Sequence, residues 1–408
     1  MSTPLMALAE MQRLTTPFPD GTAVRAWKAE GGRVVGFVGL GVPEEVIHAA
    51  RMLPFRISAE NEPIALPTAE GYMFANTGSV AKALLQMALD GRYDFLDAVV
   101  FSVTNEGTGG LVDNWRAYAP RPYMDSIFLP LKRTEEACAL YLSDLDDWRS
   151  RLSEMRCAYI VDRDLKRSIE LYNHGRDLLQ KLYALRKRER PPVTGAESLE
   201  IIKAATRMPR EQFNDLLEQL LAEIASTGRE VRKSRRLMVI GSDLQNSTWI
   251  KAVEALDAVV VTDDLCTGTR YCFGQVDATL PPMEALARYY LLARTPGPRA
   301  WPAWERFRHI VGMAERYRVD GVISQVQRHD DEYGQDTAFL RKAMHERGIP
   351  VLELEVEYGD GRSTQLTTRI GAFLEALRKR TKAGFQSTGM SSESPARNAP
   401  APAVRRLH

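Results

Sequence analysis

Residues 33–43, RVVGFVGLGVP, are the stretch that first indicates the fold. The apolar run at 33–38 predicts a buried strand, and Gly39-Leu40-Gly41 predicts a tight turn after it. A helix is predicted to begin at Pro43, because proline suits the first helical position. Its predicted apolar face consists of Val46, Ile47, Ala49, Ala50 and Leu53. The stretch therefore predicts a strand–turn–helix unit.

The same alternation recurs on both sides of a long helical stretch. Before it, the predicted elements are a helix at 79–90, a strand at 98–103, a glycine-rich turn at 105–110 and a short helix around 111–115. After it, strands are predicted at 237–240, 258–261, 319–326 and 350–355, with helices ending at 256 and covering 283–292, 307–317, 337–347 and 367–378. Residues 133–226 between them lack such strands and repeat leucine at helical spacing. This pattern predicts an α/β protein with two Rossmann/flavodoxin-like parallel-sheet domains joined by a helical insert.

Five parts are expected along the chain. They are an N-terminal helical segment at 1–30, a first α/β domain at 31–130, a helical insert at 131–229, a second α/β domain at 230–380 and a disordered tail at 381–408. The tail is rich in Ser, Pro, Ala and Arg, which cannot bury enough apolar surface to offset the entropy of ordering.

Composition excludes several classes of partner. The 408 residues include 54 basic and 53 acidic side chains, a net charge of +1, which offers no field for nucleic acid or anionic lipid. The longest apolar run, residues 34–43, is far shorter than the roughly 18–20 residues needed to cross a membrane. The N-terminus does not resemble a secretory signal, and the four cysteines form no CxxC pair. We therefore expect a cytoplasmic protein without contacts to nucleic acid or membrane.

Recognised catalytic motifs are missing from the sequence. Gly39-Leu40-Gly41 is an incomplete dinucleotide-binding pattern, because Glu44 stands at the third glycine position and would repel a diphosphate. A plain turn is the favoured interpretation. No GxSxG, HExxH or Walker sequence occurs, so hydrolase and nucleoside-triphosphatase functions are not indicated.

Three loops are expected to converge on one crevice. Residues 329–332, His-Asp-Asp-Glu, follow the strand at 319–326, residues 105–110 follow the strand at 98–103, and residues 76–79 open a helix. Open α/β sheets bind ligands at the carboxyl ends of their strands. The acidic cluster at 329–332 has the ligand types of a divalent metal site, but a solvated loop or helix start is favoured, because consecutive residues rarely converge on one ion.

Several segments together resemble the family of 2-hydroxyacyl-CoA dehydratase and benzoyl-CoA reductase subunits, over about residues 33–378. They are Val34-Val35-Gly36, Pro43-Glu44-Glu45, Met52-Leu53-Pro54, ALDGRYDFLDAVV at 88–100, DDLCTGTRY at 263–271, VDGVI at 319–323, GIPVL at 348–352, and Gln365 with TRI at 368–370 and AFLE at 372–375. The resemblance implies lyase or oxidoreductase chemistry on a CoA thioester in anaerobic metabolism. It also implies pairing with a homologous subunit or a second copy of this chain, and an ATP-dependent activator of the complex.

Subunits of this family usually hold an iron–sulfur cluster through three cysteines, and here those positions are Gly78, Asn105 and Asp330. Cluster iron needs thiolate or, in some centres, imidazole ligands. We therefore expect that this chain binds no cluster and no other metal, and that a partner subunit carries the cluster. Cys266 is expected to be a small buried residue at a strand end, and Cys138 and Cys157 packing residues of the helical insert.

The candidate site follows from the replaced positions. Glu45, Asn105 and Asp330 are predicted to form an oxygen-lined pocket for general acid–base catalysis, with a site for a hard metal ion as the alternative. Predicted substrate contacts are Gly78, Ser79, Glu106, His329 and Arg270. For Glu45 the alternative is a first-turn carboxylate that the helix dipole stabilises by about 0.3–1 kcal/mol.

The expected function is that of a cluster-free subunit of a dehydratase- or reductase-like complex that acts on an acyl- or aryl-CoA thioester. Two alternatives remain open. One is a cluster-independent acyl-CoA hydratase or dehydratase that uses acid–base residues, and the other is a non-catalytic assembly or binding subunit.

Overall fold

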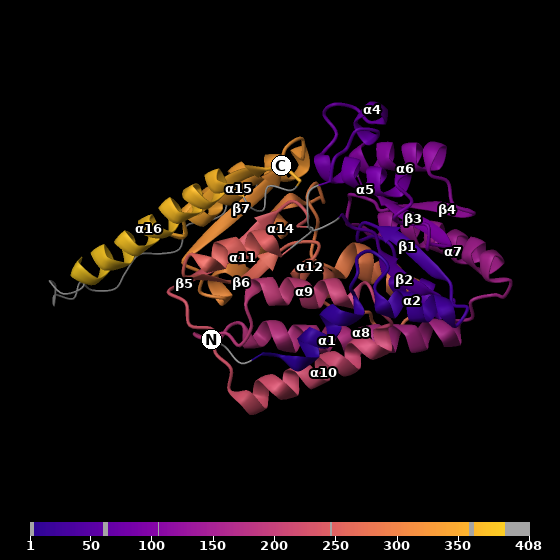
Figure 1. Cartoon of the computed structure of the whole chain (residues 1–408), viewed down its shortest axis with the longest axis horizontal. Coiled ribbons are helices and arrows are strands. Elements are labelled where there is room, and N and C mark those ends of the chain that lie inside the picture. The colour runs from indigo at the N-terminus through magenta and orange to yellow at the C-terminus, as the bar shows by residue number, and fades with distance from the viewer. Residues whose placement is uncertain (1–3, 60–63, 105, 245–246, 359–362, 388–408) are drawn as a thin grey trace.

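The chain folds into two four-stranded parallel sheets surrounded by helices (Figure 1). The computed structural model describes residues 4–59, 64–104, 106–244, 247–358 and 363–387. The first sheet contains β1 (Val34–Val38), β2 (Leu53–Arg56), β3 (Ala98–Val103) and β4 (Tyr123–Phe128), and the second contains β5 (Arg235–Gly241), β6 (Ala258–Asp264), β7 (Gly321–Gln327) and β8 (Val351–Val356). The predicted α/β class with two parallel sheets is confirmed.

Both sheets have the same strand order, β2-β1-β3-β4 and β6-β5-β7-β8. In each sheet the second strand is added on one side of the first, and the third and fourth strands are added on its other side. Such reversals create a switch point between β1 and β3 and another between β5 and β7, where ligands of open α/β sheets bind. The loops of the predicted site follow β3 and β7.

The first sheet is covered by helices on both faces, because its strands present apolar side chains on both sides. On β1, Val35 and Phe37 belong to one apolar cluster, whereas Val34 belongs to another. The first cluster contains residues of α3 (Glu44–Ala49), α7 (Glu135–Arg156), α8 (Asp162–Leu185), α13 (Pro282–Arg288) and the π-helical turn Tyr289–Ala293. The second contains residues of α2 (Thr22–Ala29), α4 (Ala69–Tyr72), α5 (Ser79–Leu89) and α6 (Glu106–Tyr118).

The second sheet is also covered by helices on both faces. Met238 and Ile240 of β5 face one helical layer, and Leu237 and Val239 face the other. The first layer includes α1 (Met6–Leu14), α10 (Arg210–Thr227), α12 (Thr269–Cys272), α14 (Ala303–Arg316) and α15 (Asp331–His345), and the second includes α11 (Thr248–Ala255) and α16 (Thr364–Ser387). Helix α9 (Gly195–Ala205) contributes to both.

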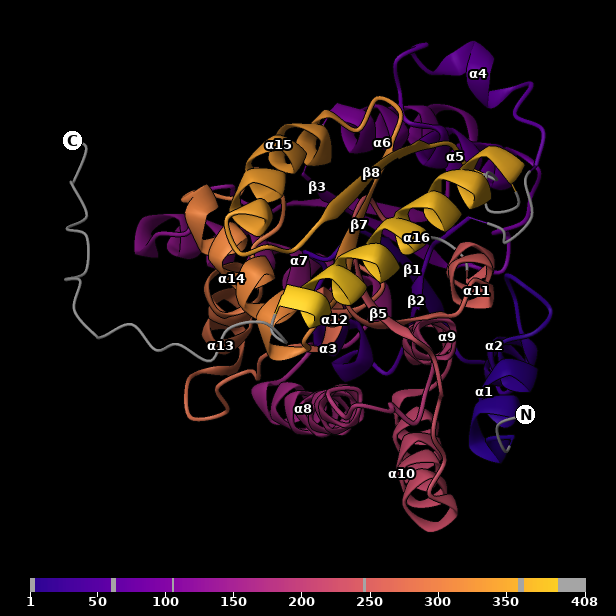
Figure 2. The ribbon, with the colours of Figure 1, turned by 90° about the vertical axis from the view of Figure 1, so that its left-hand side faces the viewer.

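The stretch predicted to be helical, residues 133–226, is confirmed as helices α7 to α10. Helix α8 connects the cores of the two sheets, and Figure 2 shows it below them beside α10. Leu165 and Ile169 in its first half pack with the first sheet's cluster, and Leu178 and Leu182 in its second half pack with the second sheet's cluster. Helix α8 therefore packs against the cores of both sheets. The five-part division of the chain stays a prediction.

The structure differs from the sequence-based expectation in four places. Leu53, predicted on a helix face, is the first residue of β2, because α3 ends at Ala49 and Arg51 takes a left-handed backbone (φ 57°). Strand β4 was not predicted, because Asp125 and Ser126 interrupt the apolar residues of YMDSIF and the strand is half-exposed at the sheet edge. The glycine-rich turn at 105–110 is helical from Glu106 onward.

The fourth difference lies at the C-terminus. Helix α16 continues to Ser387, whereas the helix was predicted to end at 378. Residues 388–408 lie outside the described part of the chain. Among the helices that the structure describes, none combines the length and the apolar character required to span a membrane.

Candidate functional site

The switch point of the second sheet is closed by a hydrogen bond between the loops after β5 and β7. Ser242 Oγ donates to Asp330 Oδ2 (2.5 Å) and accepts from the backbone N–H of Gln327 (2.9 Å). The two strands approach so closely here that a Cβ at Gly241 would lie 1.8 Å from the carbonyl oxygen of Gln325. Gly241 also has a φ of 118°, so the position requires glycine.

Asp330 is a half-buried carboxyl group whose partners are neutral, the hydroxyl of Ser242 and the backbone N–H of Tyr333. Burial raises the pKa of Asp330 above its ordinary value, and the hydrogen bond from Ser242 opposes this rise only in part. The group therefore keeps a proton to a higher pH than an exposed aspartate does. That property suits a general acid or base.

The acidic cluster at 329–332 is the start of a helix. Asp330 stands at the N-cap position of α15, and Asp331 and Glu332 lie in its first turn, where the helix dipole favours negative charge. His329 is exposed and adopts a left-handed backbone (φ 66°). Within the described ranges, no group of three or more His, Cys, Asp and Glu side chains is arranged to hold a metal ion.

Gly78 and Ser79 meet the loops of the second sheet. A Cβ at Gly78 would lie 3.9 Å from the carbonyl oxygen of Arg328, and Ser79 Oγ accepts a hydrogen bond from the backbone N–H of Tyr358 (2.9 Å). The start of α5 and the loops after β7 and β8 are therefore neighbours. Asn105 lies outside the described residues, and of Glu106 only the backbone, as the first residue of α6, is described.

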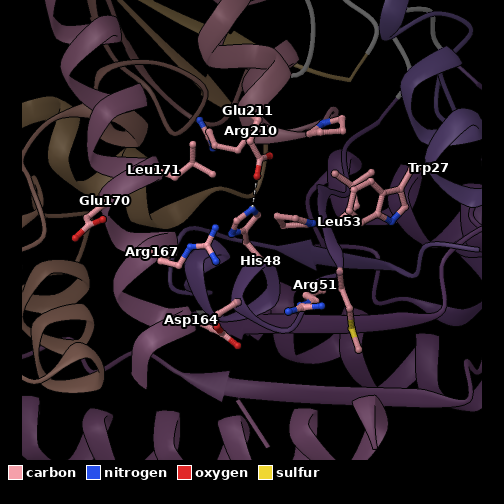
Figure 3. Close-up of a pocket in the computed structure, with 14 residues that line it drawn as sticks. Trp27, His48, Arg51, Leu53, Asp164, Arg167, Glu170, Leu171, Arg210 and Glu211 are labelled. Carbon is pink, nitrogen blue, oxygen red and sulfur yellow. Dashed lines mark hydrogen bonds and ion pairs between the residues drawn. The ribbon is translucent and has the colours of Figure 1, made fainter. Parts of the chain in front are cut away.

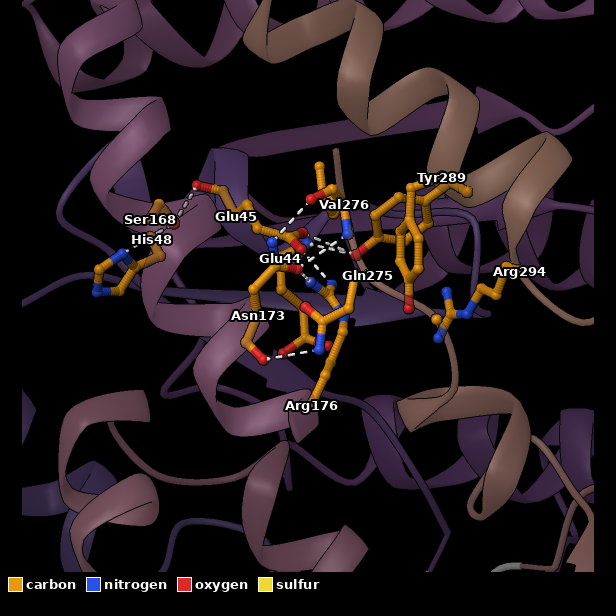
Figure 4. A network of polar contacts seen from close by, with 12 residues as sticks. Glu44, Glu45, His48, Ser168, Asn173, Arg176, Gln275, Val276, Tyr289 and Arg294 are labelled. Atoms are coloured by element: carbon orange, nitrogen blue, oxygen red, sulfur yellow. Dashed lines mark hydrogen bonds and ion pairs between the residues drawn. The ribbon is translucent and has the colours of Figure 1, made fainter. Parts of the chain in front are cut away.

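Glu45, in the first turn of α3, is in a different environment, a fully buried ion-pair cluster (Figure 4). Arg176 of α8 forms an ion pair with Glu45 Oε1, and the hydroxyl of Tyr290 donates to Oε2 (2.8 Å). Burial by itself raises the pKa of Glu45, but the charge and the hydrogen bond of Arg176 outweigh it and hold the pKa below its usual value. Glu45 is therefore a buried carboxylate paired with a cation, a stronger constraint than the predicted helix-dipole interaction.

The pKa of the neighbouring Glu44 is shifted in the opposite direction. Its Oε2 lies 3.1 Å from Arg210 Nη2 and 3.2 Å from the hydroxyl of Tyr271. Burial raises the pKa of Glu44, Arg210 opposes the rise, and the negative charge of Glu45 adds to it. The partners of both glutamates are 131 to 245 positions away in the sequence, so no local pattern could have predicted them.

Glu45 and Asp330, predicted to share one pocket, make no common contact among the described residues. Glu45 contacts helix α8 and the π-helical turn, whereas Asp330 contacts Ser242 and the start of α15. The two carboxyl groups thus belong to separate hydrogen-bond clusters.

Arg270, a predicted substrate contact, is buried behind the loop after β6. Its Nη1 donates to the hydroxyl of Tyr333 (2.6 Å) and lies 3.2 Å from the thiol sulfur of Cys266. Arg56, at the end of β2, donates to the carbonyl oxygen of Cys266 (2.9 Å) and pairs with Asp243 (3.0 Å). These contacts connect the end of the first sheet to the loops of the second.

The cysteines are distributed over distant parts of the fold. Cys138 is buried within α7, as expected for a packing residue. Cys157 is exposed at the end of α7 in a left-handed conformation, so it is not a packing residue as predicted. Cys266 is only partly buried, and Cys272 is buried in α12.

Comparison with known proteins assigns the family. The pattern of the family described as 2-hydroxyglutaryl-CoA dehydratase, D-component, matches residues 40–377, and the chain belongs to this family. It is similar to a subunit of benzoyl-CoA reductase from Thauera aromatica, with 24% identity over 366 residues, 88% of this chain and 95% of the relative. It is also similar to the (R)-phenyllactyl-CoA dehydratase beta subunit of Clostridium sporogenes, with 24% identity over 360 residues (88% and 96%). A third relative is the beta subunit of (R)-2-hydroxyglutaryl-CoA dehydratase of Acidaminococcus fermentans, 22% identical over 364 residues (87% and 95%).

Two of the positions that the sequence resemblance aligns with cluster cysteines, Gly78 and Asp330, offer no thiolate. Gly78 has no side chain to offer, and the carboxyl oxygen of Asp330 is bonded to Ser242. Iron–sulfur clusters are held by thiolates. Of the four cysteines, only Cys266 lies in a loop at this end of the second sheet, with its sulfur against Arg270.

Proposed function

We propose that this chain is a subunit of a 2-hydroxyacyl-CoA dehydratase- or benzoyl-CoA reductase-like complex that acts on an acyl- or aryl-CoA thioester and that it holds no cluster itself. The observation that carries the proposal is the contact of Gly78 with the loop of Arg328 to Asp330. The proximity of Gly78 to Arg328, two residues before Asp330, supports the proposal that both positions lie at a strand end where this fold binds ligands, and neither residue bears a thiol. The match along about 95% of the length of these relatives supports a role in a similar complex.

The partner in this proposal is a homologous subunit with intact cysteines, which supplies the cluster and receives electrons from an ATP-dependent activator. This chain contributes the shape of the substrate enclosure. Its loops after β5 and β7 are held together by the Ser242 to Asp330 bond, and the absent side chain of Gly78 leaves room beside the carbonyl of Arg328. We place the complex in the cytoplasm.

The test compares turnover of 2-hydroxyacyl-CoA and aryl-CoA esters by three samples: this chain, the homologous subunit, and the two co-expressed and purified without oxygen. Reductant and activator are present in each case. The proposal predicts that the two-subunit complex turns over the thioester and that this chain alone does not. A homologous subunit that is fully active without this chain would contradict the proposal.

A second candidate function is acid–base hydration or dehydration of an acyl-CoA without iron, and the environment of Asp330 favours it. A carboxyl group that retains its proton can protonate a leaving hydroxyl group, which departs as water, and the resulting carboxylate can accept a proton in return. Asn105 is the other residue that we assign to this chemistry, whereas Glu45, which pairs with Arg176, belongs to a separate cluster.

The two candidates differ in the behaviour of the isolated chain. Acid–base catalysis predicts turnover by this chain alone and its loss in Asp330→Asn, which keeps the shape and the hydrogen bond from Ser242. Asp331→Asn, one residue further into α15, is the matched control and should retain activity. Equal activity of the Asp330→Asn variant and the native chain would exclude the acid–base role.

A further inference from the structure

Exposed aromatic side chains form a patch on α14 and α15, which lie side by side on the outside of the second sheet (Figure 2). Trp301, two residues before α14, is 65% exposed, Trp304 in the first turn of α14 is 51% exposed, and Phe339 of α15 is 64% exposed. The ring of Phe339 stacks on that of Phe307 of α14, with the ring centres 5.9 Å apart, so the two helices present one surface. We call Trp301, Trp304, Phe307 and Phe339 the aromatic face.

The aromatic face has the size of a protein contact. A large aromatic side chain has about 150–250 Å² of surface, so the three most exposed rings together present roughly 400 Å². A patch of this size is about as large as a monomer exposes and is often functional. It supplies about half of the roughly 800 Å² that each partner covers in a standard interface. Aromatic side chains are also enriched among the residues that carry most of the binding energy of such interfaces.

The loop that carries Trp301, residues 294–302, lies at the carboxyl ends of strands in both sheets. The backbone N–H of Trp301 donates to the carbonyl oxygen of Leu131 (2.8 Å), three residues after β4. Nη1 of Arg294 donates to the carbonyl oxygen of Leu40 (2.7 Å), two residues after β1. The aromatic face therefore begins at the edge of the sheets where the candidate site lies.

The same loop adjoins the candidate site on the second sheet. Arg299 forms an ion pair with Glu332 (3.3 Å) in the first turn of α15, two residues after Asp330. A Cβ at Gly297 would lie 2.7 Å from Nη2 of Arg270, which is in the segment after β6. A protein that covers the aromatic face is therefore placed beside the segments that carry Asp330 and Arg270.

The missing thiols indicate which protein covers this face. Neither Gly78 nor Asp330 offers a thiolate, and a second copy of this chain would bring the same two residues. A homologous subunit with intact cysteines is the partner that completes the site. An interface beside the site is the place from which such a partner can reach it.

We propose that the aromatic face is the surface on which the homologous subunit docks, with Trp301, Trp304 and Phe339 as its apolar anchors. Docking there covers the loop at 294–302 and places the partner next to the carboxyl ends of both sheets. The inference rests on the proposed function, and it adds the surface through which the two subunits pair.

Analytical ultracentrifugation of this chain with the homologous subunit, both purified without oxygen, tests the proposal by measuring the Kd of the complex. Trp304→Ala and Phe339→Ala should each raise the Kd by at least about tenfold, because each removes an aromatic anchor. Both side chains are exposed in the isolated chain, so the melting temperature of each variant should stay close to that of the native chain.

The matched control is Tyr159→Ala, which removes an aromatic ring that is 62% exposed at the other edge of the first sheet. Met155, four residues earlier, accepts a hydrogen bond from Arg33, the residue before β1. A pocket of about 730 Å³ adjoins the same edge, because its wall includes Leu53 at the start of β2 (Figure 3). This edge is where the strands begin, away from the aromatic face, so Tyr159→Ala should leave the Kd unchanged.

Three results would overturn the proposal. If the native chain binds the homologous subunit and both variants bind it equally well, the two subunits pair through another surface and the proposed function stands. If the variants keep the Kd but raise the KM of the complex for the CoA ester, the aromatic face contacts substrate instead. If the native chain does not bind the homologous subunit, the proposed function fails together with this inference.

Discussion

Asp330 and Glu45 are both carboxyl groups near the start of a helix that follows a strand, yet their surroundings shift their pKa values in opposite directions. Asp330 accepts a hydrogen bond from a hydroxyl group and favours the protonated form. Glu45 faces a guanidinium group and a phenol, and favours the ionised form. A buried carboxylate neutralised by a cation thus serves the fold, whereas a carboxyl group without a cation is available to hold a proton.

The largest expected effect comes from breaking the ion pair of Glu45. Arg176→Met leaves a buried carboxylate without its cation, which should lower the free energy of unfolding by about 3–5 kcal/mol. Urea unfolding measures this change. The double variant Arg176→Met with Glu45→Gln should recover part of the loss, because it removes the isolated charge. A single variant as stable as the native chain would show that the pair does not support the fold.

A slightly smaller loss is expected where the loops of the Asp330 cluster meet. Gly241→Ala forces a Cβ to within 1.8 Å of the Gln325 carbonyl, at a φ of 118°. We expect a loss of at least about 2 kcal/mol in the free energy of unfolding. Gly109→Ala in α6, where a Cβ meets no atom within 4 Å, is the control and should be neutral or stabilising.

The two carboxyl groups should also respond to pH with opposite signs. The lowered pKa of Glu45 gives stability that is complete above its ordinary value of 4.5 and is lost as the pH falls through the lower folded value. Glu45→Gln should therefore flatten the acid side of the stability curve. Urea unfolding over a pH series measures the slope of the free energy of unfolding against pH. An unchanged slope would contradict the role given to Arg176.

For Asp330 the raised pKa means that stability is complete below the ordinary value of 3.8 and is lost as the pH rises through the higher folded value. Asp330→Asn removes this loss and retains an acceptor for Ser242. At neutral pH the variant should be as stable as the native chain, or more stable by up to about 1 kcal/mol. Marked destabilisation, again measured by urea unfolding, would show that the ionised carboxylate itself supports the fold.

The smallest effect is expected at Gly78. An added Cβ would have only one contact, at 3.9 Å from the carbonyl oxygen of Arg328, which is an ordinary van der Waals distance. Gly78→Ala should change the free energy of unfolding by less than about 0.5 kcal/mol. A large loss would mean that this position is packed more tightly than the structure shows.

Much of the fold could be predicted from the sequence because six of the eight described strands contain short runs of apolar, largely β-branched residues. Strand β6 shows no alternation of apolar and polar residues, because it is buried on both faces, and its continuous apolar run was still recognisable. Strand β2 has four residues and closely follows a six-residue helix, so its signal merged with that of the helix. Strand β4 lies at an edge and lacks an apolar run.

The site was less accessible to sequence reasoning because its contacts cross the chain. The proximity of Gly78 to Arg328 joins positions 250 residues apart, and the pair of Arg176 with Glu45 joins positions 131 residues apart. The ends of the parallel strands indicated which loops carry the candidate site, and this location stays a prediction. Which carboxyl group would find a cation depended on how α8 packs against α3, which no local pattern specifies.

We infer that this chain has the family's fold without the family's cluster. The most direct test is the content of iron and acid-labile sulfide in the chain purified without oxygen, alone and together with its homologous subunit. We expect neither element in the isolated chain and both in the two-subunit complex. Stoichiometric iron and sulfide in the isolated chain would contradict this inference and would mean that this subunit itself takes part in electron transfer.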